Sequence, residues 1–288
     1  MKALVIGASG QVGGALLAVL EREGFEALGT YVTKEYPGAA HLDVRDLESV
    51  QRCFGKFEPG VVFLAVNTPG GVDFCEEYPE EARAVIVAGT RNVLTVSAHH
   101  EALVVFYSSD YVFDGRAGPY SEDDEPEPVN VYGKAKLAAE ELVREYRHRS
   151  LILRTTAVYS WEQSSKNFAM QVFRRLQAGE RMRAPIDQWC NPTLADHLAE
   201  TSLRLLQSEA RGIYNVVGRT RTNRAEFAKA LAKTVALDAS LIVPVQTDEL
   251  AQKALRPLNA GLTTDKIAKL LGTEPLTLQE SLKRLLRA

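Results

Sequence analysis

The amino-acid sequence predicts an α/β fold, with a doubly wound parallel sheet and a smaller C-terminal lobe. Two observations lead to this prediction. Short apolar runs alternate with helix-length segments through residues 1–155. The first run, Lys2–Ile6, leads through a glycine-rich turn into a helical segment. Strands joined by helices pair in parallel, and we expect their crossovers to be right-handed.

The individual elements follow from these runs. The expected strands are Lys2–Ile6, Ala27–Val32, Val61–Val66, Leu103–Tyr107 and Leu151–Arg154. The expected helices are Gly14–Glu23, Leu47–Phe54, Glu80–His99 and Tyr132–His148. The segment 115–130 is rich in prolines and acidic residues, which indicates a surface loop before the last of these helices.

The second half of the chain is less regular. Helical patterns occur at 167–178, 194–206, 224–236 and 264–271. We therefore expect residues 1–155 to form the main domain and residues 156–288 mainly a lobe that covers the strand ends. One later strand, near 212–217, is expected to return to the main sheet.

Composition excludes several classes of protein. The 288 residues hold 34 Lys and Arg against 37 Asp and Glu, a net charge of −3, so no nucleic-acid footprint is expected. We find no apolar window of about 18 residues, and glycines interrupt the apolar N-terminus, so neither a membrane span nor a signal peptide is expected. Three scattered cysteines and no clustered ligand motif argue for a reducing, cytoplasmic location and against a metal site.

The turn after the first run has the spacing GxxGxxG, at Gly7, Gly10 and Gly13. Glycines permit a tight turn and a close approach of the backbone to a pyrophosphate, and the N-terminus of the next helix attracts anions. A tight strand–helix turn without a ligand is the alternative. The position of the turn favours a dinucleotide-binding Rossmann domain. The expected contacts in this turn are Gly7, Ser9, Gly10, Gln11, Val12 and Gly13.

The second expected strand bears on which dinucleotide binds. No carboxylate stands at its end to hold a ribose 2′-hydroxyl, and Lys34 lies just beyond it. This favours NADP(H), with NAD(H) possible. Asp43 could contact the adenine amine, whereas Asp46 could instead cap the following helix. Beyond the glycine turn, the expected cofactor contacts are Tyr31, Asp43, Val44, Ala65, Val66, Tyr107, Tyr132 and Lys136.

Tyr132 and Lys136 form a YxxxK pair on one face of an expected helix. A YxxxK spacing often arises by chance. Whether this one is functional therefore depends on the elements that precede it along the chain. Ser109 closely follows an expected strand, where ligands of open α/β sheets bind, and the tyrosine helix follows after one loop. We therefore expect Tyr132 to act as general acid and base, helped by the charges of Lys136 and of the oxidised nicotinamide. Ser109 would hold the reacting oxygen, and Lys136 would also bind the nicotinamide ribose.

Five motifs carry a family resemblance. They are GASGQVG, YSSDYVFDG (Tyr107–Gly115), YGKAK, DQWCNPT (Asp187–Thr193) and RPLNAGLTTDK (Arg256–Lys266). Together they resemble the extended short-chain dehydrogenase/reductases, and most closely the dTDP-4-dehydrorhamnose reductases. The resemblance implies reduction of a keto group on a nucleotide-linked 6-deoxy sugar with NADPH or NADH. It also implies that Ser109, Asp110 and Tyr132 contact the substrate, that Tyr132 and Lys136 are catalytic, and that the protein forms a homodimer.

Four positions depart from the family pattern. Leu64 and Ile86 stand where the family usually has asparagine, Ala157 where it has a tryptophan that packs on the deoxysugar, and Thr263 where it has aspartate. Two other functions therefore stay open. One is a non-catalytic, NADP-binding regulatory subunit resembling the β subunit of methionine adenosyltransferase. The other is a sugar-nucleotide epimerase of the same family.

Four large side chains each have two interpretations. Arg154 and Arg256 could bind a substrate diphosphate or form structural ion pairs. Trp161 and Trp189 could line a substrate pocket or pack within the lobe.

Overall fold

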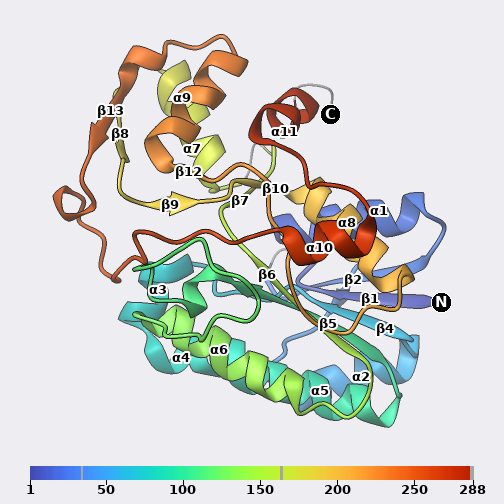
Figure 1. Cartoon of the computed structure of the whole chain (residues 1–288). Helices are drawn as coiled ribbons and strands as arrows, with labels where there is room; N and C mark the ends of the chain where they lie inside the picture. The colour runs from blue at the N-terminus through green and yellow to red at the C-terminus, as the bar shows by residue number, and fades with distance from the viewer. Residues whose placement is uncertain (34, 163–164, 286–288) are drawn as a thin grey trace.

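A seven-stranded parallel sheet forms the centre of the computed structural model, which describes residues 1–33, 35–162 and 165–285. The strand order is β11-β6-β5-β4-β1-β2-β3, so the sheet is doubly wound about β1 (Figure 1). Its strands are β1 (Lys2–Ile6), β2 (Glu26–Tyr31), β3 (Ala40–His41), β4 (Val61–Leu64), β5 (Leu103–Ser109), β6 (Ser150–Thr155) and β11 (Gly212–Asn215). The predicted fold class is confirmed.

Helices cover both faces of the sheet (Figure 1). One face carries α1 (Gln11–Arg22), α8 (Ala195–Gln207) and α10 (Asp265–Leu271). The other carries α2 (Leu47–Phe57), α3 (Gly71–Glu77), α4 (Pro79–Arg83), α5 (Gly89–His99) and α6 (Val131–Arg144). Because both faces are covered, β4 and β5 are buried along their whole length, which explains their continuous apolar runs.

The smaller lobe lies beyond the carboxyl ends of the strands (Figure 1). Its core is formed mainly by α7 (Phe168–Gln177), α9 (Arg224–Thr234), α11 (Leu278–Leu285) and the parallel pair of β8 (Met182–Pro185) and β13 (Ile242–Val245). Two short pairs complete it: β7 (Val158–Tyr159) with β10 (Thr193–Leu194), and β9 (Trp189–Cys190) with β12 (Thr222–Asn223). Between lobe segments the chain returns to the main sheet through α8 and β11.

One expected helix forms over its whole length but contains a π-helical turn. The segment predicted as Glu80–His99 consists of α4, a π-helical turn at Ala84–Ala88, and α5. Thr90 donates its hydroxyl to the Ile86 carbonyl at 2.6 Å inside this segment. The turn packs against α6, the helix that carries Tyr132 and Lys136. π-Helical turns often mark functional sites.

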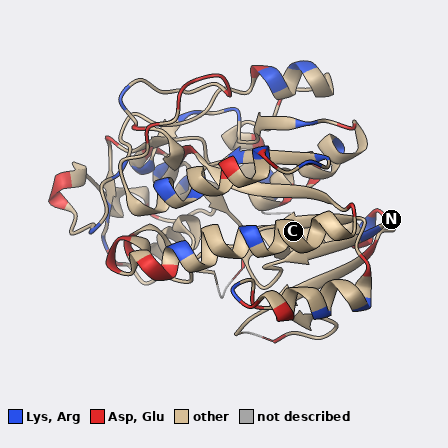
Figure 2. Cartoon of the chain, turned by 90° about the horizontal axis from the view of Figure 1, so that it is seen from below, with Lys and Arg blue, Asp and Glu red and all other residues tan. Residues whose placement is uncertain are grey.

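The chain carries both signs of charge along its helices. Basic and acidic residues are interleaved on the helices that Figure 2 displays. Within the described ranges, no helix is long and apolar enough to cross a bilayer. The same residues contain no group of three or more histidine, cysteine or acidic side chains placed to hold a metal ion.

Phe63 provides a test of the core. Its ring is fully buried in β4 between β1 and β5. We expect Phe63→Ala to lower the free energy of unfolding by about 3–5 kcal/mol, because it removes apolar contacts and leaves a cavity. Urea denaturation measures this change. Leu255→Ala is the control, since Leu255 is 71% exposed, and it should change stability by less than about 0.5 kcal/mol. Equal effects of the two variants would contradict the described packing.

Candidate functional site

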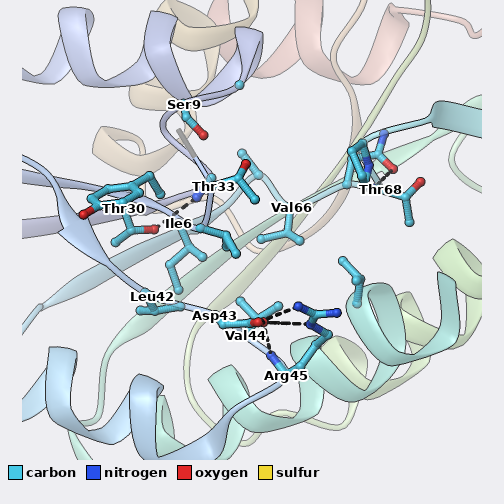
Figure 3. Close-up of a pocket in the computed structure, with 18 of the residues that line it drawn as sticks. Ile6, Ser9, Thr30, Thr33, Leu42, Asp43, Val44, Arg45, Val66 and Thr68 are labelled. Carbon is cyan, nitrogen blue, oxygen red and sulfur yellow. Dashed lines mark hydrogen bonds and ion pairs between the residues drawn. The ribbon is translucent and has the colours of Figure 1, made fainter. Parts of the chain in front are cut away.

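A cavity of about 580 Å³ opens at the carboxyl ends of β1, β2 and β4 (Figure 3). Eight of the predicted cofactor contacts line it: Gly7, Ser9, Gly10, Tyr31, Asp43, Val44, Ala65 and Val66. Residues that sequence reasoning did not single out as contacts also line it, among them Thr30, Thr33, Arg45, Asn67, Thr68 and Phe74. The cavity lies at the edge of the sheet where open α/β folds bind ligands.

The glycine turn forms one wall of this cavity. Gly7 has a φ of +88°, and a Cβ there would lie 2.8 Å from the Ala65 carbonyl oxygen. A Cβ on Gly13 would lie 2.4 Å from the Gly7 carbonyl oxygen. The first turn of α1 therefore packs directly against the turn that precedes it, as a pyrophosphate-binding loop requires. These residues fit a dinucleotide.

Three predicted contacts in and beyond this turn face elsewhere. Gln11 accepts hydrogen bonds from the hydroxyls of Ser160 and Ser165, at 3.4 and 3.3 Å, which links the glycine turn to the following lobe. Val12 packs against the core beneath α1. The Tyr107 hydroxyl donates to Ser202 on α8 at 2.8 Å, so this side chain turns away from the face that carries α6.

The far end of the cavity is charged. Arg45 donates to both carboxylate oxygens of Asp43, with an Nη2–Oδ2 distance of 2.7 Å, and this ion pair points into the cavity (Figure 3). These hydrogen bonds hold the pKa of Asp43 below its usual value despite partial burial. Asp46 accepts from the Glu48 amide at 3.0 Å and caps α2. The two aspartates thus have separate positions, one at the cavity and one at the helix. Lys34 lies outside the described residues.

Helix α6 carries Tyr132 and Lys136 to the same edge of the sheet. Asn130 caps this helix by accepting from the Gly133 amide at 2.8 Å. The Lys136 ammonium donates to the carbonyl oxygens of Val66 at 3.2 Å and Tyr107 at 2.9 Å. Its Nζ lies 5.9 Å from the centre of the Tyr132 ring. Because Val66 also lines the cavity, the pair sits at the border of the expected cofactor site.

Ser109 lies at the end of β5 and contacts the tyrosine. Its hydroxyl donates to Asp110 at 3.2 Å and accepts from the Tyr111 amide at 3.3 Å. The Ser109 hydroxyl also lowers the pKa of the Tyr132 phenol, against the larger effect of burial. The structure therefore brings Ser109, Tyr132 and Lys136 together, as the order along the chain predicts. Asp110 lies beside them and is almost fully buried.

Burial controls the protonation of this group. It raises the pKa of Tyr132 above its ordinary value of about 10, a direction opposite to that expected from Lys136. Burial also lowers the pKa of Lys136 to about 8, although Cys75 and Glu140 oppose the shift. It raises the pKa of Asp110 to about 6, opposed mainly by a hydrogen bond from Thr156. Near neutral pH the site thus holds a protonated phenol beside an ammonium.

Three of the positions that depart from the expected family pattern are apolar in the structure. Leu64 is buried at the end of β4, and Ile86 is buried in the π-helical turn that packs against α6; both belong to the same core cluster as Tyr132. Ala157, between β6 and β7, has a φ of +46°, a left-handed conformation that is unfavourable for alanine.

The structure distinguishes between the two interpretations of the arginines. Arg154 is fully buried and pairs with Glu140 at 2.7 Å, and Arg256 pairs with Asp73 at 2.8 Å. Both therefore form structural ion pairs. Trp161 packs edge-on against Phe173 in the lobe. Trp189 is 36% exposed, with the Arg221 guanidinium 4.8 Å from its ring.

Comparison with known proteins places the whole chain in one group. The family model described as "RmlD substrate binding domain" matches residues 1–288. The probable low-salt glycan biosynthesis reductase Agl14 of Haloferax volcanii is 31% identical over 99% of this chain and 97% of its own. Methionine adenosyltransferase 2 subunit beta of Xenopus tropicalis is 30% identical over 93% of this chain and 82% of its own.

Comparison with solved structures supports the same family. The dTDP-4-dehydrorhamnose reductase of Bacillus anthracis, solved in complex with NADP, superimposes with a TM-score of 0.90. It is 26% identical, and the match covers 99% of this chain and 98% of that one. The resemblance to the extended short-chain reductases that the motifs predict is confirmed.

Gly13 tests the role of the glycine turn. We expect Gly13→Ala to weaken NADPH binding at least about tenfold, because its Cβ would collide with the Gly7 carbonyl and displace α1 from the turn. Fluorescence titration with NADPH measures the change.

The matched control for this substitution is Gly55→Ala. Gly55 lies within α2, and a Cβ there would meet nothing within 4 Å. This variant should gain about 0.5–1 kcal/mol of stability and bind NADPH normally. Unchanged affinity in the Gly13 variant would show that the dinucleotide does not use this turn.

Proposed function

The chain belongs to the family of the RmlD substrate binding domain, and on that premise we propose that it is an NAD(P)H-dependent reductase of a keto group on a nucleotide-linked 6-deoxy sugar. The observation that carries the proposal is the position of the buried Tyr132 beside Ser109 and Lys136, where burial raises the pKa of the phenol above its ordinary value. A protonated phenol suits a reductase, because reduction of a carbonyl needs a proton donor.

The residues of this chain would divide the reaction among them. When bound, the reduced nicotinamide supplies the hydride. Ser109 would donate a hydrogen bond to the carbonyl oxygen, and Tyr132 would protonate that oxygen as hydride reaches the carbon. Lys136 would bind the nicotinamide ribose and stabilise the phenolate that Tyr132 becomes. Asp110 would contact the sugar.

NADP(H) is the cofactor that we favour. No side chain of β2 or of the two residues after it brings to the cavity the carboxylate that would hold the ribose 2′-hydroxyl of NAD. Gly7, Ser9, Gly10 and Val66 would contact the cofactor, and Asp43 and Val44 would hold the adenine. The dTDP-4-dehydrorhamnose reductase of Bacillus anthracis, a structural relative, was solved with NADP. A homodimer and a cytoplasmic location stay predictions.

Tyr132→Phe tests the catalytic assignment. We expect turnover of NADPH with a dTDP-linked 4-keto-6-deoxy sugar to fall at least about a thousandfold, because the variant has no proton to give. The loss of NADPH absorbance measures turnover, and fluorescence titration confirms that the variant still binds NADPH. Tyr146→Phe is the matched control, since its hydroxyl donates to the Ala102 carbonyl instead. Retained turnover in Tyr132→Phe would disprove the assignment.

The pKa of Lys136 predicts a pH dependence. Below about pH 8 this residue is an ammonium that stabilises the phenolate, and above it the charge is lost. We therefore expect kcat/KM for reduction to fall as the pH rises through about 8. A pH–rate profile of the wild type measures this alkaline limb, the fall of kcat/KM at high pH. The Lys136→Met variant should not show this fall. A flat alkaline profile in the wild type would contradict the role of the ammonium.

A regulatory subunit is the second candidate. It is favoured by the match to methionine adenosyltransferase 2 subunit beta and by the absence of the family tryptophan at Ala157. Such a protein would keep Tyr132 and Lys136 for binding NADP alone. If it is one, the purified chain should bind an S-adenosylmethionine synthetase and show no turnover with keto sugars. Surface plasmon resonance against that enzyme distinguishes the two candidates.

A further inference from the structure

A buried ion pair lies one helical turn below the tyrosine–lysine pair. Glu140 follows Lys136 on the same face of α6, and both of its carboxylate oxygens accept from Arg154 on β6. The distances are 3.0 Å from Nε to Oε1 and 2.7 Å from Nη2 to Oε2. Both side chains are completely buried. The pair therefore has the two-pronged geometry that fixes a carboxylate in one orientation.

Stability alone does not explain this pair. Removing two charges from water costs several kcal/mol each, and apolar replacements of buried pairs are often neutral or stabilising. Arg154 also keeps a buried Nη1 that has no hydrogen-bond partner among the described residues. Its register neighbours, Ser108 and Asn215, bury unpaired oxygens too. So costly an arrangement suggests a role beyond packing.

The position of the pair connects it to the candidate site. Arg154 lies beside Ser108 in the sheet, one residue before Ser109. The guanidinium lies 5.0 Å from the Phe113 ring, which closely follows the turn that carries Asp110. The pair thus joins α6, which carries Tyr132 and Lys136, to β6 at the position beside Ser108 of β5.

The charged and titratable groups around Lys136 come from two elements. Its own helix presents Tyr132 and Glu140, and α3 presents Cys75. The loop after β4 and the strand β5 present the carbonyls of Val66 and Tyr107 to its ammonium. Burial raises the pKa of Cys75 and so keeps that thiol neutral. Glu140 therefore supplies the full negative charge in this set, and it helps to keep Lys136 protonated.

We propose that Glu140 and Arg154 are positioning residues, which hold Lys136 as an ammonium and fix α6 against β6, the neighbour of β5, so that Tyr132 meets Ser109. The proposal rests on the reductase function proposed above. Neither residue touches the substrate or the reacting atoms. Arg154 orients the carboxylate and offsets the cost of its burial, and Glu140 acts on the ammonium one turn away.

A double substitution, Glu140→Leu with Arg154→Met, tests the proposal without leaving a buried charge unpaired. Arg144, whose Nη2 lies 3.5 Å from Glu140, loses this contact but its side chain is 47% exposed to solvent. We expect the variant to fold with near wild-type stability, because apolar side chains replace both charges. We expect kcat to fall at least about tenfold and the alkaline limb of the pH–rate profile to move to lower pH by roughly half a unit or more. The direction follows because an ammonium without its carboxylate loses its proton more readily.

Glu141→Gln is the matched control. It removes the same charge from the next position of α6, where the side chain faces solvent. Its pH–rate profile and kcat should equal those of the wild type. The single variant Glu140→Gln should shift the alkaline limb of the pH–rate profile in the same direction as the double variant. It should also lose stability, because the buried Arg154 then has no negatively charged partner.

A direct titration separates this proposal from the reductase function. The NMR signal of Lys136 in ¹⁵N-lysine-labelled protein, assigned through its loss in Lys136→Met, reports the lysine pKa without any turnover. A lower pKa in the double variant supports the proposal, even if the wild type reduces no keto sugar. An unchanged pKa would overturn it. So would a double variant destabilised by more than about 3 kcal/mol, which would show that the pair is structural.

Discussion

The candidate site depends on the burial of one ammonium group. Lys136 is only 3% exposed, and its Nζ donates to two backbone carbonyls at the ends of adjacent strands. The Phe106 ring, 5.0 Å from Nζ, and the Glu140 carboxylate supply further negative potential. Without these partners a buried lysine would lose its charge. The contacts that keep the Lys136 ammonium charged also fix α6 on the sheet. The charge of Lys136 and the position of its helix therefore depend on the same interactions.

Parallel topology explains why the parts of the site meet. The carboxyl ends of β1, β4 and β5 lie at one edge of the sheet, and each strand is followed by a functional segment: the glycine turn, the Val66 loop and Ser109. Val66 joins two of these parts, because it lines the cavity while its carbonyl binds Lys136. A dinucleotide in the cavity would therefore reach the tyrosine and lysine without any rearrangement of the sheet.

The sequence predicts much of this arrangement, because its strongest signals are local. Apolar runs locate the strands, and the YxxxK spacing with Ser109 locates the candidate catalytic group. Other features depend on tertiary contacts. The β8–β13 pair joins segments far apart in the chain, and no local pattern indicates it. The position of Tyr107 could have been inferred from the alternation of side chains along β5. The raised pKa of Tyr132 could not have been inferred from the sequence, because it results from burial in the folded chain. The role of Arg45 at the cavity had only a weak signal in the sequence, namely its position two residues after Asp43.

The departures from the family pattern affect the two halves of the site unequally. The expected cofactor half keeps its glycine turn, its strand ends and Lys136, whereas Ala157 stands where the family resemblance leads us to expect a tryptophan. An alanine at a φ of +46° costs of order 1 kcal/mol, so the surrounding structure must impose this conformation. The Thr193 amide donates to the Ala157 carbonyl at 3.3 Å, and β7 begins at the next residue, which holds the turn in place. Backbone contacts therefore hold this turn without a large side chain at residue 157. Ala157 is not among the residues that line the cavity, so an alanine there leaves the expected cofactor contacts in place, which both proposed functions require.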